Sequence, residues 1–111
     1  MTCEVVYKFK PGSSLRIPMH LQQNSLGVDI TGWTITSEVR YGSKLIAPLQ
    51  VQMVTPSVGQ FNLLASPSVT KDFPLKPLEC DVMFTKTNGD VVHSPTFILD
   101  VERGVTAYVG P

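Results

Sequence analysis

The chain has 111 residues, the usual size of a single domain and enough to bury one hydrophobic core. Its nine basic and nine acidic residues cancel, and the absence of any basic run predicts no binding to nucleic acid. No apolar stretch approaches the roughly 20 residues that cross a membrane, and residues 1–10 lack the layout of a secretory signal, so we expect no membrane contact and synthesis in the cytoplasm.

Short runs of alternating apolar and polar residues, separated by prolines and glycines, follow one another along the chain. This spacing is typical of a fold built of β-strands. No stretch has the periodicity of an amphipathic helix. Residues 66–73 are predicted to form a loop or a single helical turn, which Ser66 would cap and Pro67 would begin. The predicted strands cover residues 3–10, 14–23, 33–41, 44–54, 59–65, 78–86 and 91–101.

The second run shows the clearest alternation, because every second residue from Leu15 to Leu21 is apolar. Arg16 and His20 lie on the polar face of this run, so we expect both side chains to face solvent. Pro18 lies between them and has no N–H to donate to a neighbouring strand. We therefore predict that this strand lies at the edge of a sheet or carries a bulge.

Residues that favour turns and loops separate the remaining runs. Residues 24–32 are predicted to form a loop in which Val28 turns inward. Asn88 and Gly89 are the strongest hairpin signal in the chain, since a type I′ turn requires positive φ at both central residues. The proline at position 48 is expected to interrupt the fourth run, and the Ser-Pro pair at 94–95 to break the seventh.

About seven short strands in a chain of this length predict an all-β, immunoglobulin-like antiparallel sandwich of two sheets. A small closed barrel is the alternative fold. Trp33, near the start of the third run, resembles the core tryptophan of immunoglobulin domains, although no disulfide pair flanks it. We divide the chain into one sandwich domain, residues 1–104, and a C-terminal tail, residues 105–111.

The sequence contains few groups for metal binding. A zinc site needs about three or four ligands, and the two histidines, His20 and His93, share no paired spacing with the two cysteines, Cys3 and Cys80. We therefore expect no metal and no cofactor. Cys80 lies in an apolar run and is predicted to be a small buried thiol. A disulfide formed outside the reducing cytoplasm is the alternative for the two cysteines.

The sequence also contains no arrangement typical of an enzyme. No G-x-S-x-G motif is present, and His93 and Ser94 are strand neighbours that would point to opposite faces. Asp81, Asp100 and Glu102 could in principle form a carboxylate pair of the glycosidase type. Their positions on the polar faces of neighbouring strands favour an exposed charged surface that faces Lys8, Lys10 or Arg103, so we expect no catalytic residues.

Four segments with distinct turn motifs cover nearly the whole chain: "FKPGSSLRIPMHL", "GVDITGWTITSEVR", "GQFNLLASPSVTKDFPL" and "LECDVMFTKTNGDVVHSPTFILDVERGVT". Their order and spacing resemble an immunoglobulin-like sandwich found in virion proteins of tailed bacteriophages, including baseplate and tail-fibre components. Cys80 departs from that pattern, because an aromatic residue is usual near this position. No further domain follows Thr106, so we expect a stand-alone protein rather than the first module of a longer one.

The resemblance implies a structural protein of the phage particle, located in the virion and made in the host cytoplasm. Its expected partners are other virion proteins and further copies of itself, docked through sheet edges and loops. The charged fraction of 16% is below the usual value of about 25%, which fits a surface that lies against protein, or simply a small, core-rich domain. The predicted interface residues are Arg16, Pro18, His20, Tyr41, Val105, Tyr108 and Val109.

Two alternatives remain open for these residues. The tail from Gly104 could add to a neighbour's sheet or fill its groove, or it could be a frayed terminus. Tyr41 and Tyr108 could instead stack on sugar rings, which would make the protein a carbohydrate- or receptor-binding module at the tip of the particle.

Overall fold

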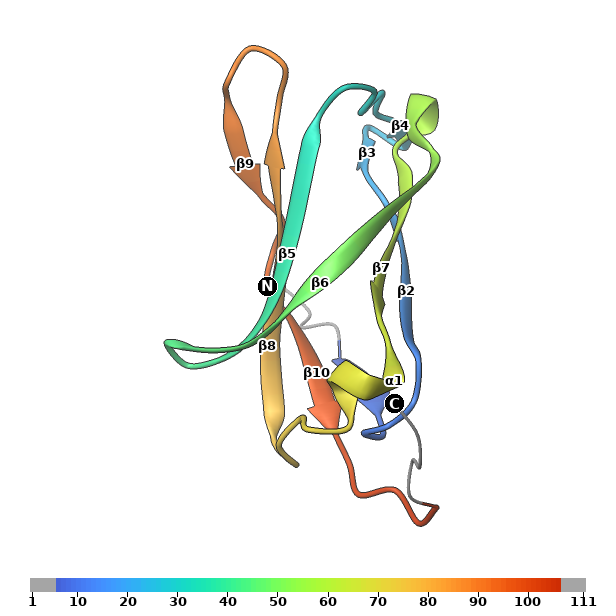
Figure 1. Ribbon diagram of the computed structural model, residues 1–111. Coiled ribbons are helices and arrows are strands. Elements are labelled where there is room, and N and C mark those ends of the chain that lie inside the picture. Colours follow the sequence, from blue (N-terminus) through green and yellow to red (C-terminus); the bar gives the residue numbers. More distant parts are fainter. Residues whose placement is uncertain (1–5, 107–111) are drawn as a thin grey trace.

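The computed structural model describes residues 6–106; residues 1–5 and 107–111 lie outside the described part (Figure 1). The described chain is almost entirely β-structure. Its elements, in chain order, are β1 (Val6–Phe9), β2 (Leu15–His20), β3 (Gln22–Gln23), β4 (Leu26–Gly27), β5 (Thr34–Tyr41), β6 (Lys44–Thr55), the 3-10 helix η1 (Pro56–Val58), β7 (Gln60–Ala65), α1 (Pro67–Thr70), β8 (Pro77–Thr85), β9 (Val91–His93) and β10 (Phe97–Val101).

The strands form two packed layers that share β6. The hydrogen-bonded order is β1-β10-β8-β5-β6-β7-β2, and β9 also pairs with β8. The first half of β6 pairs with β5 and its second half pairs with β7, so β6 crosses from one layer to the other (Figure 1). This architecture confirms the predicted all-β sandwich. One pairing differs from the antiparallel prediction, because β1 and β10 run parallel.

The core lies between the layers and follows the predicted alternation. In β8, every second residue from Leu78 to Phe84 is buried, and Val39 on β5 and Leu99 on β10 are fully buried beside them. Cys80 belongs to this core, which confirms its predicted burial, and it forms no disulfide within residues 6–106; Cys3 lies outside the described residues. Full burial of each such aliphatic side chain contributes about 1.5–3 kcal/mol to folding.

The two strand prolines occupy positions where a missing N–H is tolerated. Pro18 lies in β2, which ends the strand order and pairs only with β7 within the described residues, so the edge-strand prediction is confirmed. Pro48 does not interrupt its strand, contrary to prediction. It lies opposite Glu38 of β5, and pairing with β7 begins only at Gln50, so β6 still has one free side at the proline.

The predicted type I′ turn at Asn88 and Gly89 is wrong in its geometry. Only Gly89 has positive φ, at 94°, and its N–H donates to the carbonyl of Lys86 at 3.0 Å. The hairpin therefore has a longer loop with glycine in the left-handed position. A two-residue turn with positive φ at both positions occurs instead at Asn24 (53°) and Ser25 (66°), where β3 and β4 form a hairpin within the predicted loop.

Trp33 does not occupy the centre of the core. It precedes β5 and is only partly buried, with its ring edge-to-face against Phe84 at 6.2 Å and the Lys86 ammonium 5.5 Å from its centroid. The ring therefore covers one end of the sandwich. The analogy with an immunoglobulin core tryptophan is wrong at this position.

The helical turn α1 forms where it was predicted, with Ser66 at the N-cap and Pro67 at the first position. The Ser66 hydroxyl makes no capping bond. The turn is instead anchored by Thr70, whose buried hydroxyl donates to the carbonyl of Ser13 at 2.7 Å and accepts the Gly12 N–H at 3.1 Å. Neither α1 nor any other helix within residues 6–106 is long and apolar enough to cross a membrane.

Candidate interaction sites

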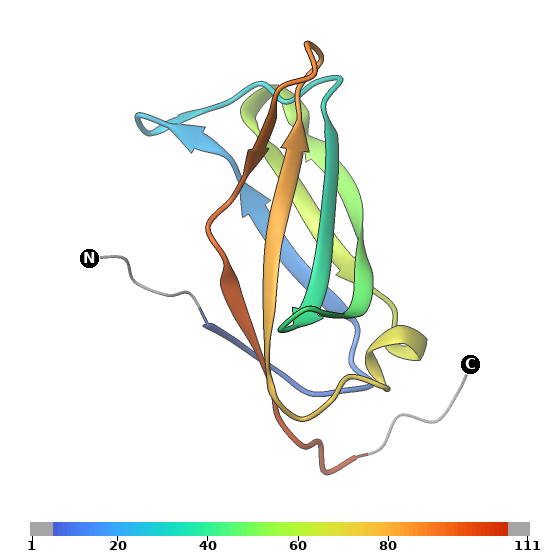
Figure 2. The same cartoon turned by 90° about the vertical axis from the view of Figure 1, so that its left-hand side faces the viewer.

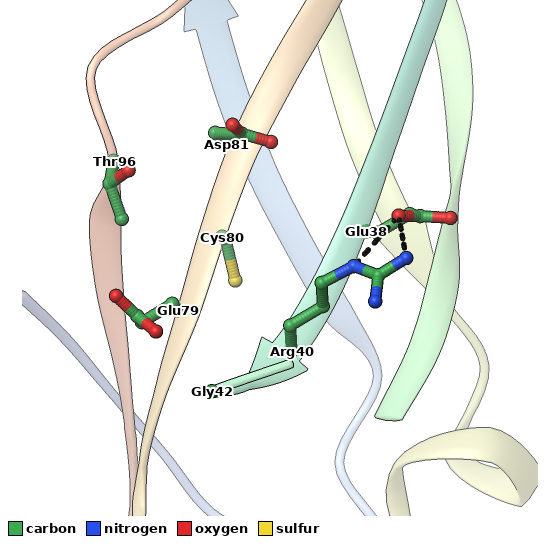
Figure 3. A pocket seen from close by; sticks show the side chains of 7 residues that line it. All are labelled: Glu38, Arg40, Gly42, Glu79, Cys80, Asp81 and Thr96. Carbon is green, nitrogen blue, oxygen red and sulfur yellow. Dashed lines mark hydrogen bonds and ion pairs between the residues drawn. The ribbon is translucent and has the colours of Figure 1, made fainter. Parts of the chain in front are cut away.

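A charged hollow lies on the outer face of the β8–β5 pair. Glu38 and Arg40 on β5 face outward opposite Asp81 and Glu79 on β8, because directly paired residues share one face of a sheet. Thr96 closes the hollow on the β10 side (Figure 3), and its volume is about 170 Å³.

The hollow carries more negative than positive charge. Arg40 donates from Nε and Nη2 to Oε1 of Glu38, at 3.1 and 2.9 Å, and from Nη1 to the Ser43 carbonyl at 3.1 Å. Glu38 is thereby neutralised, whereas Glu79 and Asp81 form no ion pair within residues 6–106. The Asp81 charge adds to burial in raising the pKa of the neighbouring Cys80 thiol to about 12.

The carboxylates considered for catalysis do not converge on this hollow. Of the three, only Asp81 lines it. Glu102 forms an ion pair with Lys8 at 3.4 Å, and Asp100 lies opposite the same lysine in the β1–β10 register. The predicted contact between this acidic strand end and lysine is therefore confirmed. Among the described residues, no three His, Cys, Asp or Glu side chains are grouped closely enough to hold a metal ion.

Three of the predicted interface residues lie together along the free edge strand β2. Arg16, Pro18 and His20 are all exposed. His20 is held in place by a 2.9 Å hydrogen bond between Nε2 and the carbonyl of Val58 in η1. The structure thus places these three exposed side chains in a row on a strand that, among the described residues, pairs on one side only.

The remaining predicted residues lie elsewhere. Tyr41, at the end of β5, is 46% exposed, but the Lys76 ammonium lies 4.5 Å from its ring centroid and covers one face. This geometry disfavours sugar stacking on that face of the ring. Val105 is 95% exposed after β10, and Tyr108 and Val109 lie outside the described residues.

Sequence reasoning missed a larger groove on the open side of the sandwich, which we call the β2–β9 groove. His20 and His93 line it together, although they lie on strands of different layers and share no paired spacing in the sequence. Its volume is about 460 Å³, and its lining residues include no Asp, Glu, Lys or Arg. These residues are Met19, His20, Leu21, Gln22, Phe61, Phe84, Val92, His93, Ser94 and Pro95.

No family model and no curated protein matches this chain. Solved structures do share its fold. The N-terminal domain of phage TP901-1 ORF48 superposes with a TM-score of 0.63 at 17% identity, covering 90% of this chain and 85% of that one. CopC from Methylosinus trichosporium OB3b superposes with a TM-score of 0.57 at 10% identity, covering 96% and 91%. The fibronectin(III)-like modules of Clostridium thermocellum CbhA superpose with a TM-score of 0.50 at 13% identity, covering 91% and 90%.

These similarities establish the fold class. At 17% identity or less they support an immunoglobulin- or fibronectin-like sandwich over nearly the whole chain. One sandwich architecture serves many functions, so a shared fold does not by itself give the function. The function of this chain must therefore be argued from its own surfaces.

Proposed function

We propose that this protein is a structural component of a tailed bacteriophage particle, in its tail, baseplate or fibre, and that it acts by docking onto other virion proteins. The observation that carries the proposal is the shared fold with a domain of a phage protein, over 90% of this chain and in agreement with the motif order of the sequence. The protein would be made in the host cytoplasm and reside in the virion.

The surfaces of the sandwich support a docking role. β2 has one free edge, and β9 pairs only with β8 within the described residues. An unpaired edge presents backbone donors and acceptors to an incoming strand. The chain's zero net charge also provides little repulsion against neighbouring protein surfaces.

We further propose that the role is not enzymatic and involves neither nucleic acid nor a membrane. Two observations support this proposal. Basic and acidic residues balance along the chain, and Asp81 lies apart from the strand end that carries Asp100 and Glu102. Docking needs none of the convergent acid, base and nucleophile geometry that catalysis requires.

Deleting the gene in its phage and supplying the protein in trans tests this function. We expect deletion to stop assembly of complete particles, and wild-type protein to restore it. A double variant of the β2 edge, Arg16→Asp with Pro18→Lys, changes two exposed side chains and should restore assembly poorly. Thr87→Lys, an exposed change in the β8–β9 turn, is the control and should behave as wild type. Complete, infectious particles formed without the protein would refute the proposal.

A further inference from the structure

The β2–β9 groove lies between two strand edges that belong to different layers and have no further strand partner within residues 6–106. β2 is the last strand of one layer, and β9 lies on the outer side of β8 in the other. Phe61 and Phe84 lie at its base, 2% and 4% exposed, with their rings edge-to-face at 5.8 Å. Packing in the core holds both rings, so the base of the groove is preformed. A site bordered by strand edges favours an extended occupant.

The chemistry of the groove further restricts this occupant. Val92 pairs with Phe84 across β8 and β9, so both side chains point to the same, inner face. Val92 nevertheless remains 46% exposed. With Met19 and Leu21 it forms an apolar wall that includes no charged side chain. Because burying an unpaired charge there would be costly, a complementary segment is apolar and uncharged.

The C-terminal segment of this same chain has that composition. Residues 105–111 read Val-Thr-Ala-Tyr-Val-Gly-Pro and include no charge. The small apolar residues Val105, Ala107 and Val109 alternate with the others, as the side chains of an extended segment on one face of a sheet would. At Val105 the side chain is 95% exposed, the highest value among the large apolar residues of the described chain.

The segment and the groove lie toward opposite ends of the sandwich. β10 runs from Phe97, after the Ser94–Pro95 break, toward Val101, away from the groove (Figure 1). Gly104 and Val105 then lie beside the Pro11–Ser13 turn, before β2 begins. To fill the groove of its own molecule, the segment would have to turn back and run the length of β2. A second copy can present the segment directly.

We propose that the β2–β9 groove binds residues 105–111 of a second copy as an extended segment. This proposal rests on the proposed structural function and deepens it by naming the partner and the surface. The contact joins two different surfaces, so it repeats from copy to copy and produces either a closed ring or a filament.

Solution mass measured by light scattering, across a range of concentrations, tests the contact. We expect the mass of the wild-type protein to rise with concentration. Val105→Asp should weaken association about tenfold or more by placing a charge in the apolar groove, and Val92→Glu should do the same from the groove side. The matched control is Val91→Glu. Val91 is 52% exposed on the same strand but pairs with Thr85 on the outer face, so its change should leave association intact.

Mixing the two defective variants provides a sharper test. Val105→Asp retains an intact groove and Val92→Glu retains an intact tail, so the mixture should form 1:1 dimers and no larger species. A synthetic peptide of residues 104–111 should also shift the amide resonances of Met19, Leu21 and residue 92 in the Val105→Asp protein, and should leave the resonances of Met19 and Leu21 unchanged in the Val92→Glu protein.

The proposal is overturned if the wild-type protein stays monomeric at millimolar concentration, if the mixed variants do not pair, or if the peptide causes no shift in the groove. Any of these results would leave the proposed function testable by itself. A protein that is monomeric in solution and still restores particle assembly would show docking onto other virion proteins without the contact between copies.

Discussion

At the residue scale, Thr70 shows how a single hydroxyl joins distant parts of the chain. It is fully buried, and its Oγ1 bonds both the Ser13 carbonyl and the Gly12 N–H across 57 and 58 positions of sequence. The hydroxyl depends on both bonds, because a buried donor or acceptor without a partner costs free energy, while Gly12 is half-buried and Ser13 is exposed.

Thr70→Val should therefore lower the free energy of unfolding by about 1–3 kcal/mol, since it keeps the shape of the side chain and removes both hydrogen bonds. Thr70→Ser keeps the hydroxyl and should recover more than half of that loss. Urea denaturation of the two variants measures the difference. Equal stability of Thr70→Val and wild type would show that water replaces the hydroxyl.

Cys80 is predicted to be chemically inert in the folded protein. Burial, with a smaller contribution from the Asp81 charge, raises its pKa to about 12, so roughly one thiol in ten thousand is ionised at pH 8. In a Cys3→Ser variant, iodoacetamide should label Cys80 at least about a hundredfold more slowly before unfolding than in urea. Complete labelling of the folded protein within minutes would contradict the burial of this side chain.

The same thiol affects the pH dependence of stability. An unfolded thiol ionises near pH 9.0, while the folded one retains its proton up to about pH 12. Between these values the unfolded state binds fewer protons, so stability falls as pH rises. A Cys80→Val variant should lose less stability between pH 9 and pH 10.5 than wild type, as measured by urea denaturation at each pH.

At the scale of elements, the β3–β4 hairpin depends on a close backbone approach at Gly59. Gly59 has φ of 80°, and a Cβ there would collide with the Leu21 carbonyl and lie 2.8 Å from the Val28 carbonyl oxygen. Its own carbonyl accepts the Leu21 N–H at 2.9 Å. Figure 2 shows the hairpin, in light blue, projecting from the end of the sandwich that this contact supports.

Gly59→Ala should destabilise the protein more than Gly42→Ala does. Gly42 also has positive φ, at 60°, but nothing lies within 4 Å of a Cβ there, so alanine would meet only backbone strain of about 1–2 kcal/mol. Gly59→Ala adds a collision with backbone atoms, and we expect a further loss of about 2 kcal/mol. Thermal and urea denaturation of both variants would reveal the difference, and equal losses would contradict the close approach.

The strands could be predicted from the sequence, whereas the exact turns could not. Alternation between apolar and polar residues identifies β2 and β8 because burial of one face is a local property of a strand. The Asn88–Gly89 pair signals a turn in the sequence. The type of turn is decided by the backbone hydrogen bonds that Lys86 forms with Gly89 and Asp90. The crossing of β6 between layers could not be predicted from its own alternation, because it depends on β5 pairing with the first half of the strand and β7 with the second half.

At the scale of the whole molecule, the fold was predictable and the groove was not. The seven runs, with their proline and glycine boundaries, predict a sandwich from spacing alone. The β2–β9 groove arises where the edges of two layers face each other, and this depends on how β6 joins them. The alternation in the sequence predicts that His20 is an exposed residue of an edge strand. That His20 and His93 line the same groove follows only from the tertiary structure.

If this sandwich is a structural part of a phage particle, as we propose, each purified particle contains a fixed number of copies of it. Peptide mass spectrometry against isotope-labelled standards would count the copies in independent preparations. We expect the same whole number of copies per particle in each preparation, unchanged by high-salt washing and nuclease treatment. Absence of the protein from purified particles, or an amount that falls with each purification step, would contradict the claim.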